Sequence, residues 1–88
     1  MKTVKTEATM TIKGVCNGEE FTEVVAVYLI PPKDDNHYGT GYYMRVEWPN
    51  GRYVYVDVRY EHTRDIEKLA KLWAKGYWGK NAREITVE

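Results

Sequence analysis

The sequence has little that could cross-link or anchor the chain. Its single cysteine, Cys16, cannot form an internal disulfide, and a lone thiol is typical of a reducing compartment. The longest apolar run, 24–30, has seven residues, whereas a membrane-spanning helix needs about 20. The N-terminal residues alternate polar and apolar and lack the hydrophobic segment of a secretory signal. We therefore expect a cytoplasmic protein that folds by core burial, alone or with the help of oligomerisation.

The chain also lacks a net charge. Its 13 Lys and Arg balance its 13 Asp and Glu, which argues against a protein built mainly to coat nucleic acid. The charges are unevenly spread, because residues 59–83 hold seven Lys or Arg and three Asp or Glu, a local excess of +4. Three Trp and eight Tyr supply core area, since each buried aromatic side chain removes roughly 150–250 Å² from water.

Catalytic and metal-binding patterns are scarce as well. The Asp-Asp-Asn-His segment at 34–37 could ligate a hard cation, but it lacks the spaced ligands of a calcium site and is expected to be solvated. His37 and His62 lie in no zinc-binding pattern. Cys16 has no activating base near it in the sequence, and 39–41 lacks the lysine of a phosphate-binding loop. We predict no enzyme activity, no cofactor and no metal site.

Two strands joined by a tight turn are predicted near the N-terminus. Residues 3–13 alternate as a half-buried strand does, and residues 21–30 are apolar on both faces. The Asn-Gly dipeptide at 17–18 favours a two-residue turn, which pairs Met10 with Val25, core facing core. The apolar outer face of 21–30 is then either shielded by neighbouring side chains or covered by a partner or a second copy.

Residues 41–60 are the most informative stretch, because they predict a β-hairpin with two different faces. A two-residue turn at 50–51 would put charged and apolar residues on one face. A three-residue Pro-Asn-Gly loop at 49–51 pairs Trp48 with Arg52 and keeps the apolar and the polar side chains on separate faces. It also suits a type I turn followed by a left-handed glycine. We predict this loop. One face then carries Met44, Val46, Trp48, Val54, Val56 and Val58, and the other carries Tyr43, Arg45, Glu47, Tyr53, Tyr55, Asp57 and Arg59.

One helix and a last strand are predicted after the hairpin. The helix spans 63–78, with Thr63 as its N-cap and Gly76 or Gly79 at its end. Residues 83–88 alternate again and give a short strand. The buried stripe of the helix follows helical spacing and consists of Ile66, Leu69, Ala70, Trp73 and Tyr77.

The resulting order, β-β-β-β-α-β, predicts an α+β fold: an antiparallel β-sheet with one amphipathic helix packed on one face. Placing the last strand antiparallel to the first gives the sheet order 5-1-2-3-4. The sequence contains no repeat and no low-complexity tract. Residues 1–88 are therefore expected to form a single domain.

The tyrosine-rich face of the hairpin points to binding, because Tyr and Arg are enriched where interfaces carry their energy. If the second and third strands pair core to core, Tyr28 falls opposite Tyr43, and Val24 and Ile30 enlarge the patch. Such a patch seldom lacks a purpose, although the loop at 31–41 could cover part of it. The predicted partner-binding residues are Tyr28, Tyr43, Arg45, Tyr53, Tyr55 and Arg59.

A single-stranded nucleic acid is the alternative partner. Tyrosines on strands can stack on bases, and arginines can contact phosphates. Against this, Glu23, Glu47 and Asp57 lie near the same face, and Tyr at strand positions also reflects β-propensity. The helix adds a lysine row, Lys68, Lys71 and Lys75, whose ordinary interpretation is a solvated face.

The small size, the lone sheet with one helix and the lack of catalytic groups resemble small proteins encoded by phages and mobile elements. Some of those, including anti-CRISPR proteins, act by occupying a host protein's nucleic-acid site. The resemblance rests on no motif and transfers no residue. It implies a small inhibitor that binds a host protein. The residues themselves lead us to expect a non-catalytic protein-binding module that uses the tyrosine-arginine face to bind a protein partner or a second copy in a homodimer. A computationally designed domain without natural function is a further alternative, against which Cys16 and the irregular loop argue.

Overall fold

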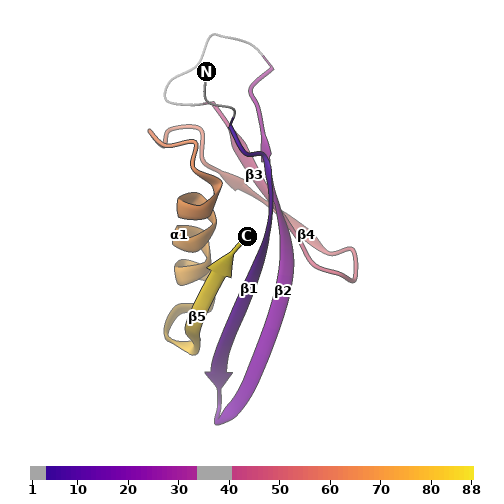
Figure 1. The fold of residues 1–88 in the computed structure, drawn as a ribbon, viewed down its shortest axis with the longest axis vertical. Helices are drawn as coiled ribbons and strands as arrows, with labels where there is room; N and C mark the ends of the chain where they lie inside the picture. Colours follow the sequence, from indigo (N-terminus) through magenta and orange to yellow (C-terminus); the bar gives the residue numbers. More distant parts are fainter. Residues whose placement is uncertain (1–3, 34–40) are drawn as a thin grey trace.

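The computed structural model describes residues 4–33 and 41–88, which form one antiparallel sheet with a helix on one side (Figure 1). The sheet order β4-β3-β2-β1-β5 confirms the predicted α+β fold and the predicted place of the last strand beside the first. The elements are β1 (Glu7–Cys16), β2 (Glu19–Ile30), β3 (Tyr43–Glu47), β4 (Tyr53–Asp57), α1 (Ile66–Trp78), a 3-10 turn (Gly79–Asn81) and β5 (Ala82–Val87).

The turn between β1 and β2 sets the register of the two longest strands. Both of its residues have left-handed backbone angles, with φ at 52° in Asn17 and 81° in Gly18, which Asn and Gly tolerate best. Met10 pairs with Val25, as predicted. The first strand spans Glu7–Cys16 and not the predicted 3–13. Its pairing with β2 starts at Glu7 and continues to Cys16, next to the turn.

The β3–β4 hairpin has the predicted three-residue loop. Trp48 N–H donates to the Arg52 carbonyl at 2.8 Å, and Gly51 N–H donates back to the Trp48 carbonyl at 3.0 Å. Gly51 has a φ of 91°, the left-handed angle that this loop requires. Val46 therefore faces Val54 across the hairpin, and the apolar and polar faces stay separate.

The helix begins at Ile66, and its N-cap is Asp65, two residues after the predicted cap Thr63. The Asp65 carboxylate accepts hydrogen bonds from the backbone N–H groups of Glu67 and Lys68, at 3.0 and 3.5 Å. Thr63 Oγ1 instead accepts from the N–H of Asp65 at 3.1 Å and fixes the segment before the helix. Of the two glycines considered, Gly79 is the C-cap, with its N–H bonded to a carbonyl of the last turn.

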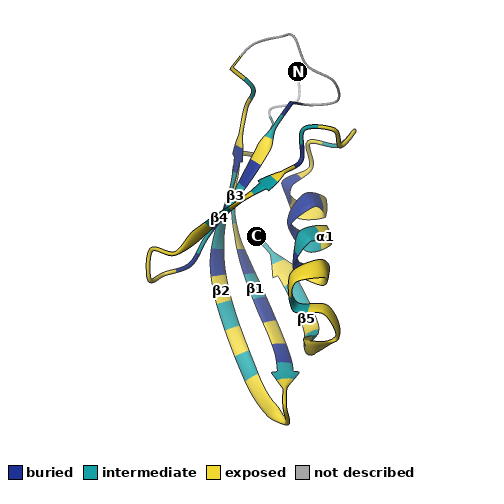
Figure 2. Ribbon diagram, turned by 180° about the vertical axis from the view of Figure 1, so that it is seen from behind, coloured by how far each residue is buried: buried dark blue, intermediate teal, exposed yellow. Residues whose placement is uncertain are grey.

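The core lies between α1 and one face of the sheet, and the burial pattern of the strands alternates accordingly (Figure 2). Ile66, Leu69 and Ala70 of the helix are buried as predicted. Tyr77 was predicted to be buried but is 44% exposed, and Ala74 is fully buried. The small side chain of Ala74 lets the helix approach the sheet. The buried apolar side chains of the strands are Met10, Ile12, Val25, Val27, Leu29, Met44 and Val46.

Aromatic rings join the second half of α1 to the end of β3. Trp73 and Tyr77 stack with their centroids 4.9 Å apart, and the Trp48 ring lies 6.2 Å from Trp73 and 6.5 Å from Trp78. Arg52 places its guanidinium 4.8 Å from the Trp48 ring and donates to the Tyr77 hydroxyl at 3.0 Å. These contacts fix the hairpin relative to the helix and thereby the orientation of the opposite face of the sheet.

Candidate functional site

The face of the sheet that points away from α1 carries the predicted binding residues. Alternate side chains of β2, β3 and β4 lie on it, and five of its large apolar side chains are between 37% and 57% exposed, namely Val24, Ile30, Tyr43, Tyr53 and Tyr55. The helix covers the other face, so this one is left uncovered by the described residues. We define the outer face as Val24, Ala26, Tyr28, Ile30, Tyr43, Arg45, Glu47, Tyr53, Tyr55, Asp57 and Arg59.

The pairing of β2 with β3 differs from the prediction by two residues. Tyr28 lies opposite Arg45, and Tyr43 lies opposite Ile30, so the predicted Tyr28–Tyr43 pair is wrong. A shift of two residues leaves every side chain on the same face, and the hydrophobic pattern therefore cannot detect it. The consequence is that Arg45 lies in the middle of the outer face, between Tyr28 on β2 and Tyr55 on β4.

The guanidinium of Arg45 lies beneath two tyrosine rings of β4. Its central carbon is 4.3 Å from the Tyr53 centroid and 5.8 Å from the Tyr55 centroid, distances at which a cation is attracted by the ring. One guanidinium nitrogen is 3.4 Å from the Glu47 carboxylate. Arg45 Nε is buried, and it has no hydrogen-bond partner among the described residues. The two rings and the Glu47 carboxylate thus hold the arginine in place.

Arg59 forms the second charged pair of the outer face. It binds Asp57 through two side-chain hydrogen bonds of 3.0 and 2.8 Å. These bonds hold the pKa of Asp57 below its ordinary value and raise the pKa of Arg59. The guanidinium also lies 5.0 Å from the Tyr43 ring centroid. Each arginine of the outer face is therefore matched with a carboxylate, and the face carries no excess of positive charge.

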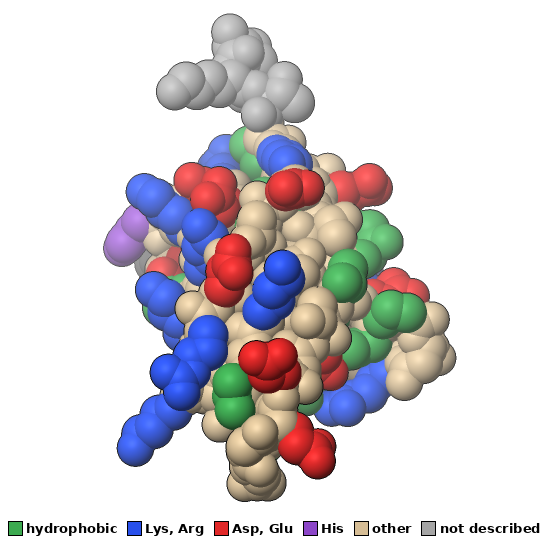
Figure 3. Space-filling model, turned by 60° about the horizontal axis from the view of Figure 1, so that its bottom comes forward, with side chains coloured by type: hydrophobic (Ala, Val, Ile, Leu, Met, Phe, Trp, Pro, Cys, Tyr) green, Lys and Arg blue, Asp and Glu red, His purple; other side chains and the backbone are tan. Residues whose placement is uncertain are grey.

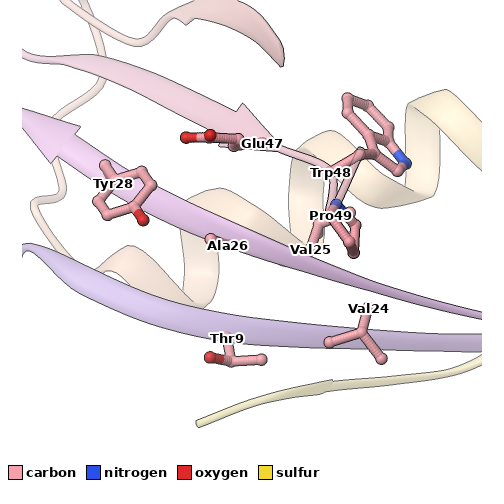
Figure 4. A pocket seen from close by; sticks show the side chains of 8 residues that line it. All are labelled: Thr9, Val24, Val25, Ala26, Tyr28, Glu47, Trp48 and Pro49. Carbon is pink, nitrogen blue, oxygen red and sulfur yellow. The ribbon is translucent and has the colours of Figure 1, made fainter. Parts of the chain in front are cut away.

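A hollow of about 360 Å³ opens in the outer face over Ala26 (Figure 4). Ala26 lies at its floor because its side chain is a single methyl group between the larger Val24 and Tyr28 on the same strand. Glu47 and Pro49 approach from the side of β3. The hollow can accept an apolar side chain, with a carboxylate at its rim. Its signal in the sequence, a small residue in the middle of an apolar strand face, did not enter the prediction.

The lysine row lies on a different side of the molecule from the tyrosines. Lys68, Lys71 and Lys75 are on the solvent side of α1, and Lys71 forms a 2.9 Å ion pair with Glu67 one turn earlier. In Figure 3 the basic side chains gather on the helix side, at the left, and hydrophobic side chains gather on the hairpin side, at the right. The rings and the lysine row therefore cannot contact one short nucleic-acid segment together.

The structure brings the predicted partner-binding residues together on one surface, with Arg45 at its centre. Residues 4–33 and 41–88 contain no group of three or more His, Cys, Asp or Glu that could hold a metal ion. The Asp-Asp-Asn-His segment at 34–37 lies outside the described residues. Among the helices described, none is long and apolar enough to cross a membrane. No protein-family model, curated protein or solved structure matches this chain.

Proposed function

We propose that the chain is a non-catalytic protein-binding module that docks through its outer face. The observation that carries the proposal is the exposure of five large apolar side chains on this face, while the opposite face packs under α1. An exposed apolar patch framed by polar groups is typical of a protein interaction site. Tyr and Arg, which dominate this patch, are the residue types that most often act as interface hot spots.

A protein partner suits the charges of this face better than a nucleic acid does. Arg45 and Arg59 are already paired with Glu47 and Asp57, and a phosphate would have to displace those carboxylates or approach them. A protein surface meets the face without that conflict, because it offers apolar side chains for the hollow over Ala26.

The side chains of the face are held in place before any partner arrives. The Tyr53 and Tyr55 rings meet edge to face with centroids 5.5 Å apart, and Arg45 lies under both. Side chains that are already ordered lose less conformational entropy on binding. We infer that binding is itself the activity of the chain, as in a small inhibitor that covers a binding surface of its partner.

A pair of triple variants tests the proposal. One variant changes the outer face by Tyr43→Ser, Tyr53→Ser and Tyr55→Ser, and the control changes the exposed side of the helix by Lys68→Ser, Leu72→Ser and Lys75→Ser. A protein captured from the cells that make the chain should bind the parent and the control with equal affinity and bind the outer-face variant at least tenfold more weakly. Thermal unfolding of both variants verifies the fold. Equal binding by all three chains would overturn the proposal.

The nucleic-acid alternative has its own test. We expect no gel shift of a single-stranded oligonucleotide by the parent chain, even at low salt. A shift that weakens steeply with added salt is the signature of phosphate contacts. If such a shift also disappeared in the outer-face variant, the face would be a nucleic-acid surface and the proposal would be wrong.

A further inference from the structure

The strand β4 forms one edge of the sheet. Its backbone N–H and C=O groups on the side away from β3 pair with no described strand. Trp48 N–H donates a hydrogen bond to the Arg52 carbonyl, and the Trp48 carbonyl accepts one from Gly51 N–H. Trp48 and Arg52 therefore occupy a hydrogen-bonded position of the hairpin. Hydrogen-bonded and non-bonded pairs alternate along an antiparallel ladder. The backbone groups of Val54 therefore point to β3, whereas those of Tyr53, Tyr55 and Asp57 point away from it. No other described strand lies on that side.

The two edges of the sheet differ in how well they are protected. At β5 the register shifts between Lys13 and Gly14, and the exposed residues Arg83 and Glu84 lie beside this irregularity. Bulges and charges of this kind discourage strand pairing. The helix also packs against β5 (Figure 1). At β4 the run Tyr53–Val56 contains no charge, no proline and no register shift. β4 is therefore the edge with fewer features that would prevent another strand from pairing with it.

We propose that β4 pairs antiparallel with β4 of a second copy of this chain, with Tyr55 opposite Tyr55. The strand reads Val-Tyr-Val about its centre, so Val54 of one copy faces Val56 of the other. Asp57 then faces Tyr53. A parallel pairing in the same register would instead place Asp57 against Asp57, and like charges directly opposite are unfavourable. The chain has no net charge, so two copies do not repel each other at long range.

The pairing gives a sheet of ten strands from two five-stranded halves, with both outer faces on the same side. Val54 and Val56, which are only half buried in one copy, gain apolar neighbours across the new pair. Tyr53 and Tyr55 of the two copies become neighbours, so the outer face doubles in extent. The pairing uses the backbone edge and leaves the outer face open, and it does not depend on the proposed function.

Disulfide trapping tests the register. In a Cys16→Ser background, Tyr55→Cys places two thiols on opposed residues whose Cα atoms are about 5.5 Å apart, a separation that a disulfide spans. Tyr53→Cys places its two thiols about four residues apart along the strands, roughly 14 Å, which no disulfide bridges. Mild oxidation should link the Tyr55→Cys chain into dimers and leave Tyr53→Cys unlinked. Equal linkage at both positions, or linkage at neither, would overturn the proposal.

Light scattering on two further variants separates the edge from the face. Tyr55→Pro removes an N–H that points away from β3, so no hydrogen bond to β3 is lost. Proline is tolerated at such a position of an edge strand. Tyr55→Thr keeps that N–H and removes the ring. We expect dimers for the parent and for Tyr55→Thr, and monomers for a folded Tyr55→Pro. A monomeric parent would contradict the pairing while leaving binding of another protein by the outer face intact. A dimeric Tyr55→Pro would also contradict it.

Discussion

The indole N–H of Trp78 donates a hydrogen bond of 2.8 Å to a carboxylate oxygen of Glu23. The bond joins the end of α1 to β2 on the helix side of the sheet, where the neighbouring position Val25 is buried. Glu23 therefore does not lie near the tyrosine face as predicted, because it shares the face of Val25. We predict that Glu23→Ala lowers the free energy of unfolding by about 1–2 kcal/mol, because it leaves a partly buried donor without its acceptor. Urea unfolding measures the loss. The control Glu20→Ala, at an exposed position of the same strand, should change stability by less than about 0.5 kcal/mol, and an equal loss there would contradict the account.

Two glycines should respond to alanine in opposite directions. A Cβ at Gly14 would collide with the backbone carbonyl oxygen of Asn81 and lie 2.8 Å from the Phe21 ring, and a backbone atom cannot move aside cheaply. We predict that Gly14→Ala costs about 1–3 kcal/mol. Gly76 lies inside α1 with open space around it, so Gly76→Ala should stabilise by about 0.5–1 kcal/mol through helix propensity. Thermal unfolding of the two variants checks both signs, and a shift in the same direction would refute the packing described at Gly14.

The two residues that could cap the helix should contribute differently to the free energy of unfolding. Asp65→Ala removes the acceptor for two backbone N–H groups at the start of α1, and we expect it to cost about 1 kcal/mol. Thr63→Ala removes a single bond in the segment before the helix and should cost less than half as much. Equilibrium unfolding in denaturant compares them. A larger loss for Thr63→Ala would show that the helix starts at the position predicted from the sequence.

The contact of Arg45 with Tyr53 should be measurable as a coupling energy. At 4.3 Å from the ring centroid, the cation is expected to contribute about 0.5–1 kcal/mol at this partly exposed site. A double-mutant cycle with Arg45→Gln and Tyr53→Leu should return a coupling of that size. The same cycle with Tyr60→Leu in place of Tyr53→Leu is the control and should return no coupling. Coupling of zero in the first cycle would mean that the ring and the guanidinium do not stay together in solution.

The Asp57–Arg59 pair should make stability depend on pH in the acid range. The hydrogen bonds from Arg59 lower the pKa of Asp57 in the folded chain, so the contribution is complete above the ordinary aspartate pKa. It is lost as the pH falls through the lowered value. Asp57→Asn should therefore lower the melting temperature at neutral pH and have no effect once the carboxylate is protonated in the parent. A penalty that stays constant down to strongly acid pH would contradict this assignment, and Glu61→Gln serves as an unpaired control.

The sequence predicted the fold well because its turn signals and the alternation of apolar residues along the strands agree with each other. The Asn-Gly turn at 17–18 and the Pro-Asn-Gly loop at 49–51 fix the registers of two hairpins. The last strand was placed beside β1 because it runs antiparallel to that strand, whereas it would run parallel to β4 at the other edge. The N-cap was misplaced because Thr63 and Asp65 both have capping side chains, and only the geometry shows which of them accepts the N–H groups of the first turn.

The outer face was predicted in composition and only partly in arrangement. Alternation along the strands places Tyr28, Tyr43, Arg45 and Tyr55 on one side. The long connection before β3 carries no turn chemistry that would set its register, so the partner of Tyr28 could not be derived. The hollow over Ala26 depends on that same register, because Glu47 pairs with Ala26. The partner of Tyr28 and the hollow therefore follow only from the structure, whereas the outer face itself follows from the alternation in the sequence.

Photo-crosslinking in the cells that make the chain tests the proposed binding most directly. A photoreactive phenylalanine analogue replaces Tyr55 on the outer face in one chain and Leu72 on the helix in another. These two positions are matched in exposure, at 57% and 62%. We predict adducts with another protein at Tyr55, beside any adduct with a second copy that the β4 pairing gives, and none of comparable yield at Leu72. Adducts at Tyr55 that nuclease removes, or equal yields at both positions, would contradict the account.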